Sequence, residues 1–213
     1  MSDTALRPGL AALSILGGMF TLGITDNFVP HISETGSLWQ FHMLRGAMAV
    51  VLLALVAGLG FGVIRPVSWR AVLGRSLFPA TAMLIYFGCL SVLPIGVVVA
   101  GLFTAPLFVL LISVVFQGAR VGVVRIVAVL AGFIGALMVI QPDPSALDPI
   151  SFLPIVAGML YAVGAVVTRL WCAREGTIAL SAGFFGMLTL FGTIGLLILP
   201  AGGPSGFDGF VAR

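Results

Sequence analysis

The stretch from Leu90 to Arg125, LSVLPIGVVVAGLFTAPLFVLLISVVFQGARVGVVR, decides the fold class. Its middle, Val97 to Phe116, holds twenty apolar or small residues and no charge, which is long enough for a helix to cross a bilayer. Pro106 lies near the centre of this run, where it lacks an N–H and frees the carbonyl of Leu102. Because lipid offers that carbonyl no partner, we expect Pro106 to mark the side of the helix that faces protein.

The composition of the whole chain also points to a membrane location. Of its 213 residues, 60% are hydrophobic and 8% are charged, whereas a soluble chain has about a quarter of its residues charged. All ten basic residues are arginine, and they are scattered singly between apolar runs. Such scattered charges form no basic patch, so we expect no nucleic-acid partner. The expected environment is the lipid bilayer.

Seven apolar segments of about the length of a membrane span can be drawn along the chain. Their connections are short, so consecutive segments should run antiparallel and pack as neighbours. We therefore predict an all-α membrane protein, a polytopic bundle of about seven transmembrane helices. The segments are Gly9–Val29, Phe41–Ile64, Leu77–Leu93, Val97–Phe116, Val121–Ile140, Ile150–Thr168 and Ile178–Leu199.

Arginine is distributed unevenly among the predicted connections. The connections after segments two, four and six carry arginine, whereas the alternating ones carry none and hold Glu34, Asp143 and Asp148. Loops rich in basic residues stay in the cytoplasm, so we expect a multi-pass inner-membrane protein with a cytoplasmic N-terminus. The residues that set this orientation are Arg7, Arg65, Arg70, Arg75, Arg120, Arg125, Arg169 and Arg174.

A faint internal repeat is present at a shift of 140 residues. It superposes the segment Ile15–Met19 on Ile155–Met159, and Gly46 on Gly186. The two copies are five spans apart, so the second would be inserted upside down, as in the inverted repeats of transporters. Matches between small and apolar residues also arise by chance, and both explanations stay open.

The pattern LPIG…PLFVLLISVV…G.RVG..R…GFIGALMVIQP, between Leu93 and Pro142, resembles the fourth and fifth helices of the EamA-like branch of the drug/metabolite transporter superfamily. The resemblance extends over nearly the whole chain and specifies a family rather than a substrate. It implies an integral inner-membrane transporter that moves a small metabolite by alternating access. It implies no cofactor and no metal.

The resemblance also implies a division of the chain into repeats. Residues 1–141 would form the first EamA-like repeat with five helices, 150–200 a partial second repeat with two, and 201–213 a short polar tail. The family has ten helices in two inverted halves, and this chain has about seven. We therefore weigh a shortened chain that works with another subunit, such as a homodimer, against a truncated, non-transporting protein that acts as an assembly or regulatory partner.

Few charged side chains fall within the predicted spans, and each is a candidate for function. Arg45 lies one turn inside segment two, with His42 three residues earlier on the same helix face, and Asp26 lies at a similar depth in segment one. Arg45 could anchor an anionic substrate group, with Asp26 as a coupling or gating partner. The alternatives are a structural ion pair or residues wetted at the membrane interface. His42 could carry a proton or could simply be hydrogen-bonded.

The family resemblance adds that Arg45 matches an arginine common at the start of the second helix, and Asp26 an acidic residue that closes the first. Other polar side chains within spans could bind a substrate, or could bond to backbone or to a neighbouring helix. We count Tyr86, Thr104 and Tyr161 among them, and add Pro106 as a position beside the site. The signatures G-x-S-x-G and H-E-x-x-H and a Cys/His metal spacing are absent from the sequence, so we predict that the protein is not an enzyme.

Overall fold

The computed structural model describes residues 8–28, 31, 36–119, 121–140 and 149–198, and every regular element in this part of the chain is helical. The prediction of an all-α bundle is confirmed for these residues. In chain order the elements are α1 (Pro8–Asp26), α3 (Leu38–Gly58), α4 (Trp69–Leu90), α5 (Ile95–Leu102), α6 (Ala105–Gln117), α7 (Val123–Ile140), the 3₁₀ helix η2 (Pro149–Phe152), α8 (Leu153–Trp171) and α9 (Thr177–Ile198).

Five of the helical segments are long and apolar enough to cross a membrane: α3, α4, α5 together with α6, η2 together with α8, and α9. Two shorter apolar stretches, Ala12–Asp26 and Val123–Gly135, lie in α1 and α7. Each of the seven predicted segments therefore falls on helical structure. The predicted tail at 201–213 lies outside the described residues.

The helix boundaries differ from the prediction where polar residues cap a helix. We expected the third helix to begin at Leu77, but α4 begins at Trp69 because the Ser68 hydroxyl accepts a hydrogen bond from the N–H of Ala71. Arg70 and Arg75, predicted to lie in a loop, are consequently helical. The connection between α3 and α4 starts after Gly58, where α3 ends. It contains Gly60 with a φ of 87°, which residues other than glycine rarely adopt.

The fourth span is broken, as Pro106 predicted. α5 ends at Leu102 and α6 begins at Ala105, with Pro106 in its first turn. The expectation that Pro106 marks the protein-facing side is wrong, because its ring is exposed. The buried side of the break is formed by Thr104 and Ala105, which pack on α8, where a Cβ at Gly158 would lie 2.6 Å from Oγ1 of Thr104.

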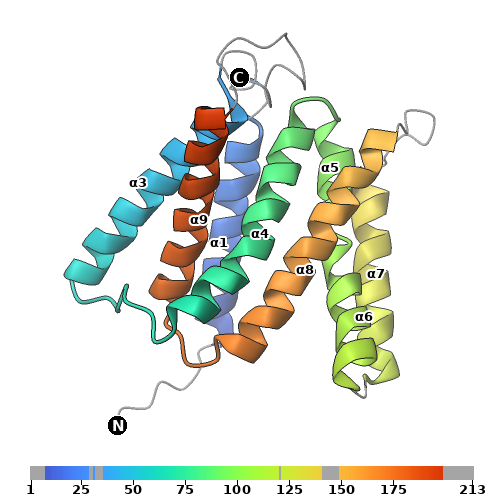
Figure 1. Cartoon of the computed structure of the whole chain (residues 1–213). Helices are drawn as coiled ribbons and strands as arrows, with labels where there is room; N and C mark the ends of the chain where they lie inside the picture. The colour runs from blue at the N-terminus through green and yellow to red at the C-terminus, as the bar shows by residue number, and fades with distance from the viewer. Residues whose placement is uncertain (1–7, 29–30, 32–35, 120, 141–148, 199–213) are drawn as a thin grey trace.

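The bundle is held together by two close helix pairs, α3 with α9 and α4 with α8, and α4 also packs on α9 (Figure 1). Small residues allow these approaches: a Cβ at Gly192 of α9 would lie 2.5 Å from the carbonyl oxygen of Trp39, and one at Gly164 of α8 would lie 2.8 Å from the ring of Pro79. α5 and α6 cover the other side of α8.

Successive spans run in opposite directions, with α5 and α6 together forming one span, so the connections gather at two ends (Figure 1). One end, which we call the Arg-rich end, holds the α3–α4, α6–α7 and α8–α9 connections. The opposite Arg-poor end holds the starts of α3, α5 and α8 and the last residues of α1, α4 and α9. The described arginines of the connections, Arg65 and Arg174, lie at the Arg-rich end, while Arg7 and Arg120 lie outside the described residues.

Candidate functional site

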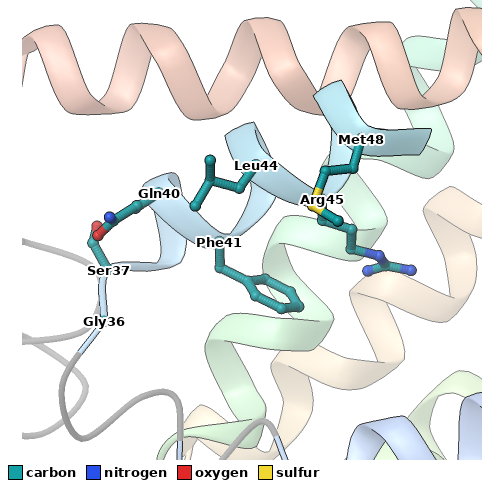
Figure 2. A pocket seen from close by; sticks show the side chains of 7 residues that line it. All are labelled: Gly36, Ser37, Gln40, Phe41, Leu44, Arg45 and Met48. Atoms are coloured by element: carbon teal, nitrogen blue, oxygen red, sulfur yellow. The ribbon is translucent and has the colours of Figure 1, made fainter. Parts of the chain in front are cut away.

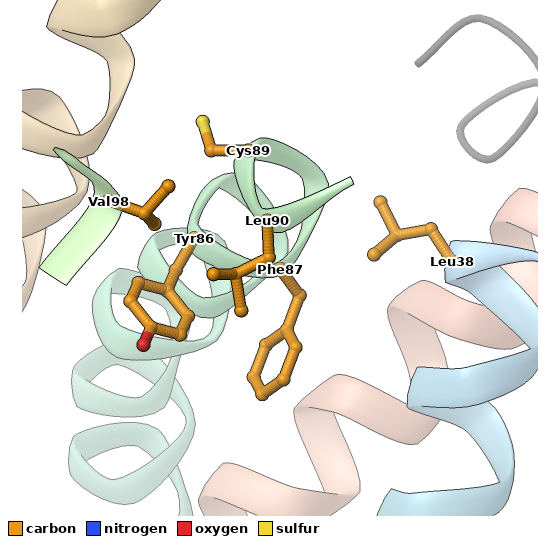
Figure 3. Close-up of a cluster of buried hydrophobic side chains, with 6 residues drawn as sticks. All are labelled: Leu38, Tyr86, Phe87, Cys89, Leu90 and Val98. Carbon is orange, nitrogen blue, oxygen red and sulfur yellow. The ribbon is translucent and has the colours of Figure 1, made fainter. Parts of the chain in front are cut away.

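A buried apolar cluster fixes the last turns of α4 at the Arg-poor end. Figure 3 shows its side chains between α3, which contributes Leu38, and α5, which contributes Val98. The members from α4 are Tyr86, Phe87, Cys89 and Leu90, all at most 4% exposed. Their packing leaves Tyr86 and Phe87 with fixed positions from which each reaches a polar partner.

Tyr86 connects α4 to α1. Its hydroxyl donates a hydrogen bond of 2.8 Å to Oδ2 of Asp26, the last residue of α1. The bond is partly buried, and a hydrogen bond to a charged acceptor is stronger than one between neutral groups. Two of the residues predicted from sequence, Asp26 and Tyr86, therefore meet, although they come from different spans.

A second group of side chains surrounds the guanidinium of Arg45. The Arg45 Cζ lies 4.8 Å from the ring centroid of Phe87, 5.8 Å from that of Phe41 and 5.9 Å from that of Phe185, so rings from α3, α4 and α9 face one cation. The ring of His42 meets Phe41 and Phe87 edge-on, at centroid distances of 5.3 and 5.2 Å. We call Phe41, His42, Arg45, Phe87 and Phe185 the Arg45 cluster.

Three buried nitrogens of the Arg45 cluster lack hydrogen-bond partners. His42 is completely buried, and neither Nδ1 nor Nε2 is bonded; Nη1 of Arg45 is also buried and unbonded. Asp26 and Arg45 form no direct ion pair within the described part of the chain, although the Asp26 carboxylate is near enough for its charge to act on the guanidinium. A buried polar group without a partner costs stability, typically by about 1–3 kcal/mol, so these atoms are a feature that packing alone does not explain.

A hollow opens beside the Arg45 cluster at the Arg-poor end. Its volume is about 600 Å³, and Phe41 and Arg45 form part of its wall. Figure 2 shows both side chains leaving α3 on the same side of the helix, with Met48 one turn after Leu44 along the rim. The other lining residues are Gly36, Ser37 and Gln40. A volume of this size falls within the range of small-molecule sites, which is about 300–1,000 Å³.

The Arg-rich end carries charged groups of a different kind. Arg75 of α4 donates from Nε to Oγ1 of Thr168 in α8 at 2.7 Å, and from Nη1 to the carbonyl oxygen of Leu180 in α9 at 3.2 Å. Glu175, between α8 and α9, accepts from the backbone N–H groups of Val67 and Ser68 at 2.8 and 2.7 Å. These four bonds tie the start of α4 to both later helices.

The remaining sequence-predicted residues lie away from the Arg45 cluster. Thr104 is buried against α8, where its hydroxyl bonds to the carbonyl of Gly101 within its own helix turn. Pro106 is exposed on α6, and Tyr161 on α8 is 44% exposed. The structure therefore brings Asp26 to Tyr86 and His42 to Arg45, and leaves the other three candidates elsewhere.

Sequence reasoning missed the aromatic part of the site. Phe41 precedes Arg45 by four residues, which places both on one helix face, and this spacing could have indicated the pair. Nothing in the sequence indicates that Phe87 and Phe185 approach the same guanidinium. Among the described residues, no three His, Cys, Asp or Glu side chains gather as a metal site.

Comparison with known proteins identifies the family. Residues 9–141 match the EamA-like transporter family, which is more than half of the chain. The chain belongs to the EamA-like transporter family. It is accordingly a multi-pass membrane protein of a transporter family and not an enzyme.

Three curated relatives of this EamA-like chain are each named riboflavin transporter. The one from Brucella anthropi is 30% identical over 154 residues, which cover 72% of this chain and 52% of the relative. Those from Rhizobium johnstonii and Vibrio cholerae are 28% and 25% identical, covering 64% and 68% of this chain and 44% and 51% of the relatives. The chain thus spans about half the length of the curated relatives it matches. No solved structure matches it significantly.

Proposed function

We propose that this EamA-like chain is an inner-membrane transporter that moves a small metabolite by alternating access, with riboflavin as the first substrate to test. The observation that carries the proposal is the Arg45 cluster: a guanidinium and an imidazole with unbonded nitrogens inside an apolar bundle. Ionisable side chains within membrane spans are costly and mark substrate or ion pathways. The names of the three relatives supply the candidate substrate.

Alternating access requires one end of the bundle to close while the other opens, and the hydrogen bonds support such an arrangement. The Arg-rich end is tied by Arg75 and Glu175, whereas the hollow beside Arg45 lies at the Arg-poor end. In this proposal the four hydrogen bonds at the Arg-rich end hold that end closed and form the gate. When they break, the substrate can leave on that side. Asp26 and Tyr86 act as the gating partners at the opposite end.

The proposal includes the repeat division, with residues 1–141 as the first repeat and 150–200 as part of the second. The packing of α3 on α9 supports it, because these two helices are related by the 140-residue shift and run in opposite directions (Figure 1). The gate bonds of Arg75 would then join one repeat to the other. The arginine bias supports an inner-membrane location with a cytoplasmic N-terminus. A homodimer remains a prediction, which light scattering of the purified protein checks.

The test is uptake of radiolabelled riboflavin into proteoliposomes that contain the purified full chain, compared with protein-free liposomes. We expect saturable uptake that competes with unlabelled riboflavin. Arg45→Gln should reduce uptake at least tenfold, while Arg125→Gln, which changes an exposed arginine of α7, should leave it unchanged. A folded, monodisperse protein without uptake of riboflavin would favour the non-transporting alternative.

A further inference from the structure

The Arg45 cluster limits the charge of what it can bind. The negative charge of Asp26, whose carboxylate accepts a hydrogen bond of 2.8 Å from Tyr86, is near enough to act on the positive charge of Arg45 without a direct ion pair. His42 is completely buried beside Arg45, so the imidazole is neutral, since a second cation there would lack compensation. The site is balanced overall, and an anion would add an uncompensated charge to an apolar interior. This balance favours an uncharged ligand over the anionic group that the sequence suggested.

The walls of the cluster limit the shape of the ligand. Three phenylalanine rings lie within 4.8 to 5.9 Å of the Arg45 Cζ, and His42 adds a fourth ring edge-on to two of them. Aromatic rings and guanidinium groups stack on flat π systems. Of the cluster, Phe41 and Arg45 line the 600 Å³ hollow, so a flat heteroaromatic ring in the hollow would meet these two side chains first.

The unbonded atoms limit the pattern of hydrogen bonds. Nη1 of Arg45 can only donate, whereas a neutral imidazole has one nitrogen that donates and one that accepts. A ring edge on which a carbonyl oxygen stands next to an N–H group matches this set. Carbohydrate chains offer hydroxyls but no flat surface for the phenylalanine rings, so a sugar alone fits less well.

We propose that the Arg45 cluster is the binding site for an uncharged, flat heteroaromatic ring, with Arg45 donating to a ring carbonyl oxygen and His42 pairing with the neighbouring carbonyl and N–H edge. This inference rests on the proposed transport function and names the part of the substrate that the chain recognises. His42 is buried against Phe41 and does not line the hollow, so the proposed contact with His42 requires the ring of Phe41 to move aside.

The first arm of the test measures ligand chemistry with the full chain in lipid nanodiscs. The probe is lumiflavin, a neutral three-ring compound with a carbonyl–NH–carbonyl edge, and binding is followed by quenching of its fluorescence. The matched probe is the same ring methylated at that N–H. We expect the methylated ring to bind at least tenfold more weakly, because one hydrogen bond is lost in a buried site. A flat anion, 2-naphthoate, should compete only at concentrations at least a hundredfold higher.

The second arm separates binding from structure with His42→Phe. This change keeps an aromatic ring between Phe41 and Phe87 and removes both unbonded nitrogens. We expect lumiflavin binding to weaken at least tenfold while the thermal midpoint stays equal or rises, since buried unpaired polar atoms are removed. Arg125→Gln on exposed α7 is the control and should change neither value.

Three results would overturn the inference: no quenching by the unchanged protein, equal affinity for the two rings, or a His42→Phe protein that is less stable and binds as before. Its failure is distinguishable from failure of the proposed function. If riboflavin is taken up, but neither methylation of the ring nor His42→Phe changes binding, the transport function is retained and this site is rejected. If methylation of the ring and His42→Phe both weaken binding, but riboflavin is not taken up, the site is retained and the transport function is rejected.

Discussion

At the Arg-rich end, Arg75 and Glu175 make four hydrogen bonds to groups of other elements, whereas at the Arg-poor end the nitrogens of His42 and Nη1 of Arg45 make none. Within the described residues, one buried side-chain atom near the Arg-rich end is also unbonded, and it belongs to the neutral hydroxyl of Ser76. Bonded charges between helices stabilise a conformation, while unbonded ones lower stability and are kept where a ligand completes them. In the proposed function, this contrast distinguishes the gate at the Arg-rich end from the binding site at the Arg-poor end.

The largest effect we expect is a difference in cysteine labelling between the two ends of the bundle, because they face opposite sides of the membrane. With cysteine placed at exposed Gln40 or exposed Gly176, a membrane-impermeant maleimide should label only Gln40→Cys in intact cells, and both after permeabilisation. The natural cysteines should stay silent: Cys89 is 1% exposed, and burial raises the pKa of the Cys172 thiol. Labelling of Gly176→Cys from outside would reverse the assignment of gate and entrance.

Removal of the bonded charge of Arg75 should lower the free energy of unfolding. Arg75→Gln loses bonds to Thr168 and to the carbonyl of Leu180, and we expect a loss of about 2 kcal/mol in the free energy of unfolding. The matched control is Arg70→Gln, five residues earlier in α4 and exposed, which should change the free energy of unfolding by less than about 0.5 kcal/mol. Unfolding in mixed micelles followed by circular dichroism measures both. Equal losses would show that the bonds of Arg75 do not hold the helices together.

The hydrogen bond from Tyr86 to Asp26 joins two helices at the Arg-poor end, and its contribution to stability can be measured by removing the Tyr86 hydroxyl. Tyr86→Phe should cost about 1–2 kcal/mol in the same unfolding assay, because the partly buried Asp26 carboxylate loses its donor. Tyr161→Phe is the control, since Tyr161 is 44% exposed, and should be neutral. If the two variants are equally stable, α1 is not attached through Tyr86.

The smallest effect should come from the exposed part of the gate. Glu175→Gln keeps one acceptor oxygen for the N–H groups of Val67 and Ser68 but loses the charge, and we expect a loss of about 1 kcal/mol or less. The neighbouring Arg174→Gln, at an exposed residue, should be neutral. A more sensitive measurement is the rate of riboflavin uptake, which should change in Glu175→Gln if these bonds break during transport. An unchanged rate would exclude Glu175 from the gate.

The fold class was predictable because membrane spans are read from length and polarity alone. The helix starts were less predictable: a single serine hydroxyl extends α4 through Arg70 and Arg75, which looked like loop residues. The break before Pro106 was predicted, but the exposed face of its ring was not. A helix that is apolar all round carries no pattern that distinguishes the face toward lipid from the face toward protein.

The same limitation applies to the site. Asp26, His42 and Arg45 could be selected as candidates because ionisable residues are rare within spans, whereas their neighbours could not be predicted. Phe87 and Phe185 lie more than 40 residues away from Arg45 in sequence, and nothing marks them out among the 16 phenylalanines of the chain. Tyr161 was selected as a polar side chain within a span, yet it points outward. Which residues meet depends on which helices pack together.

The pairing of α3 with α9 also has a consequence for how the protein is made. α3 ends at Gly58 and α9 begins at Thr177, so the ribosome adds about 120 residues between them. At about 5–20 residues per second, α3 spends on the order of ten seconds in the membrane before its partner emerges. During this time Gly46 has no neighbour from α9, and Phe185 is absent from Arg45. Substitutions in α9 should therefore reduce the yield of newly synthesised protein before they alter the rate of any mature molecule.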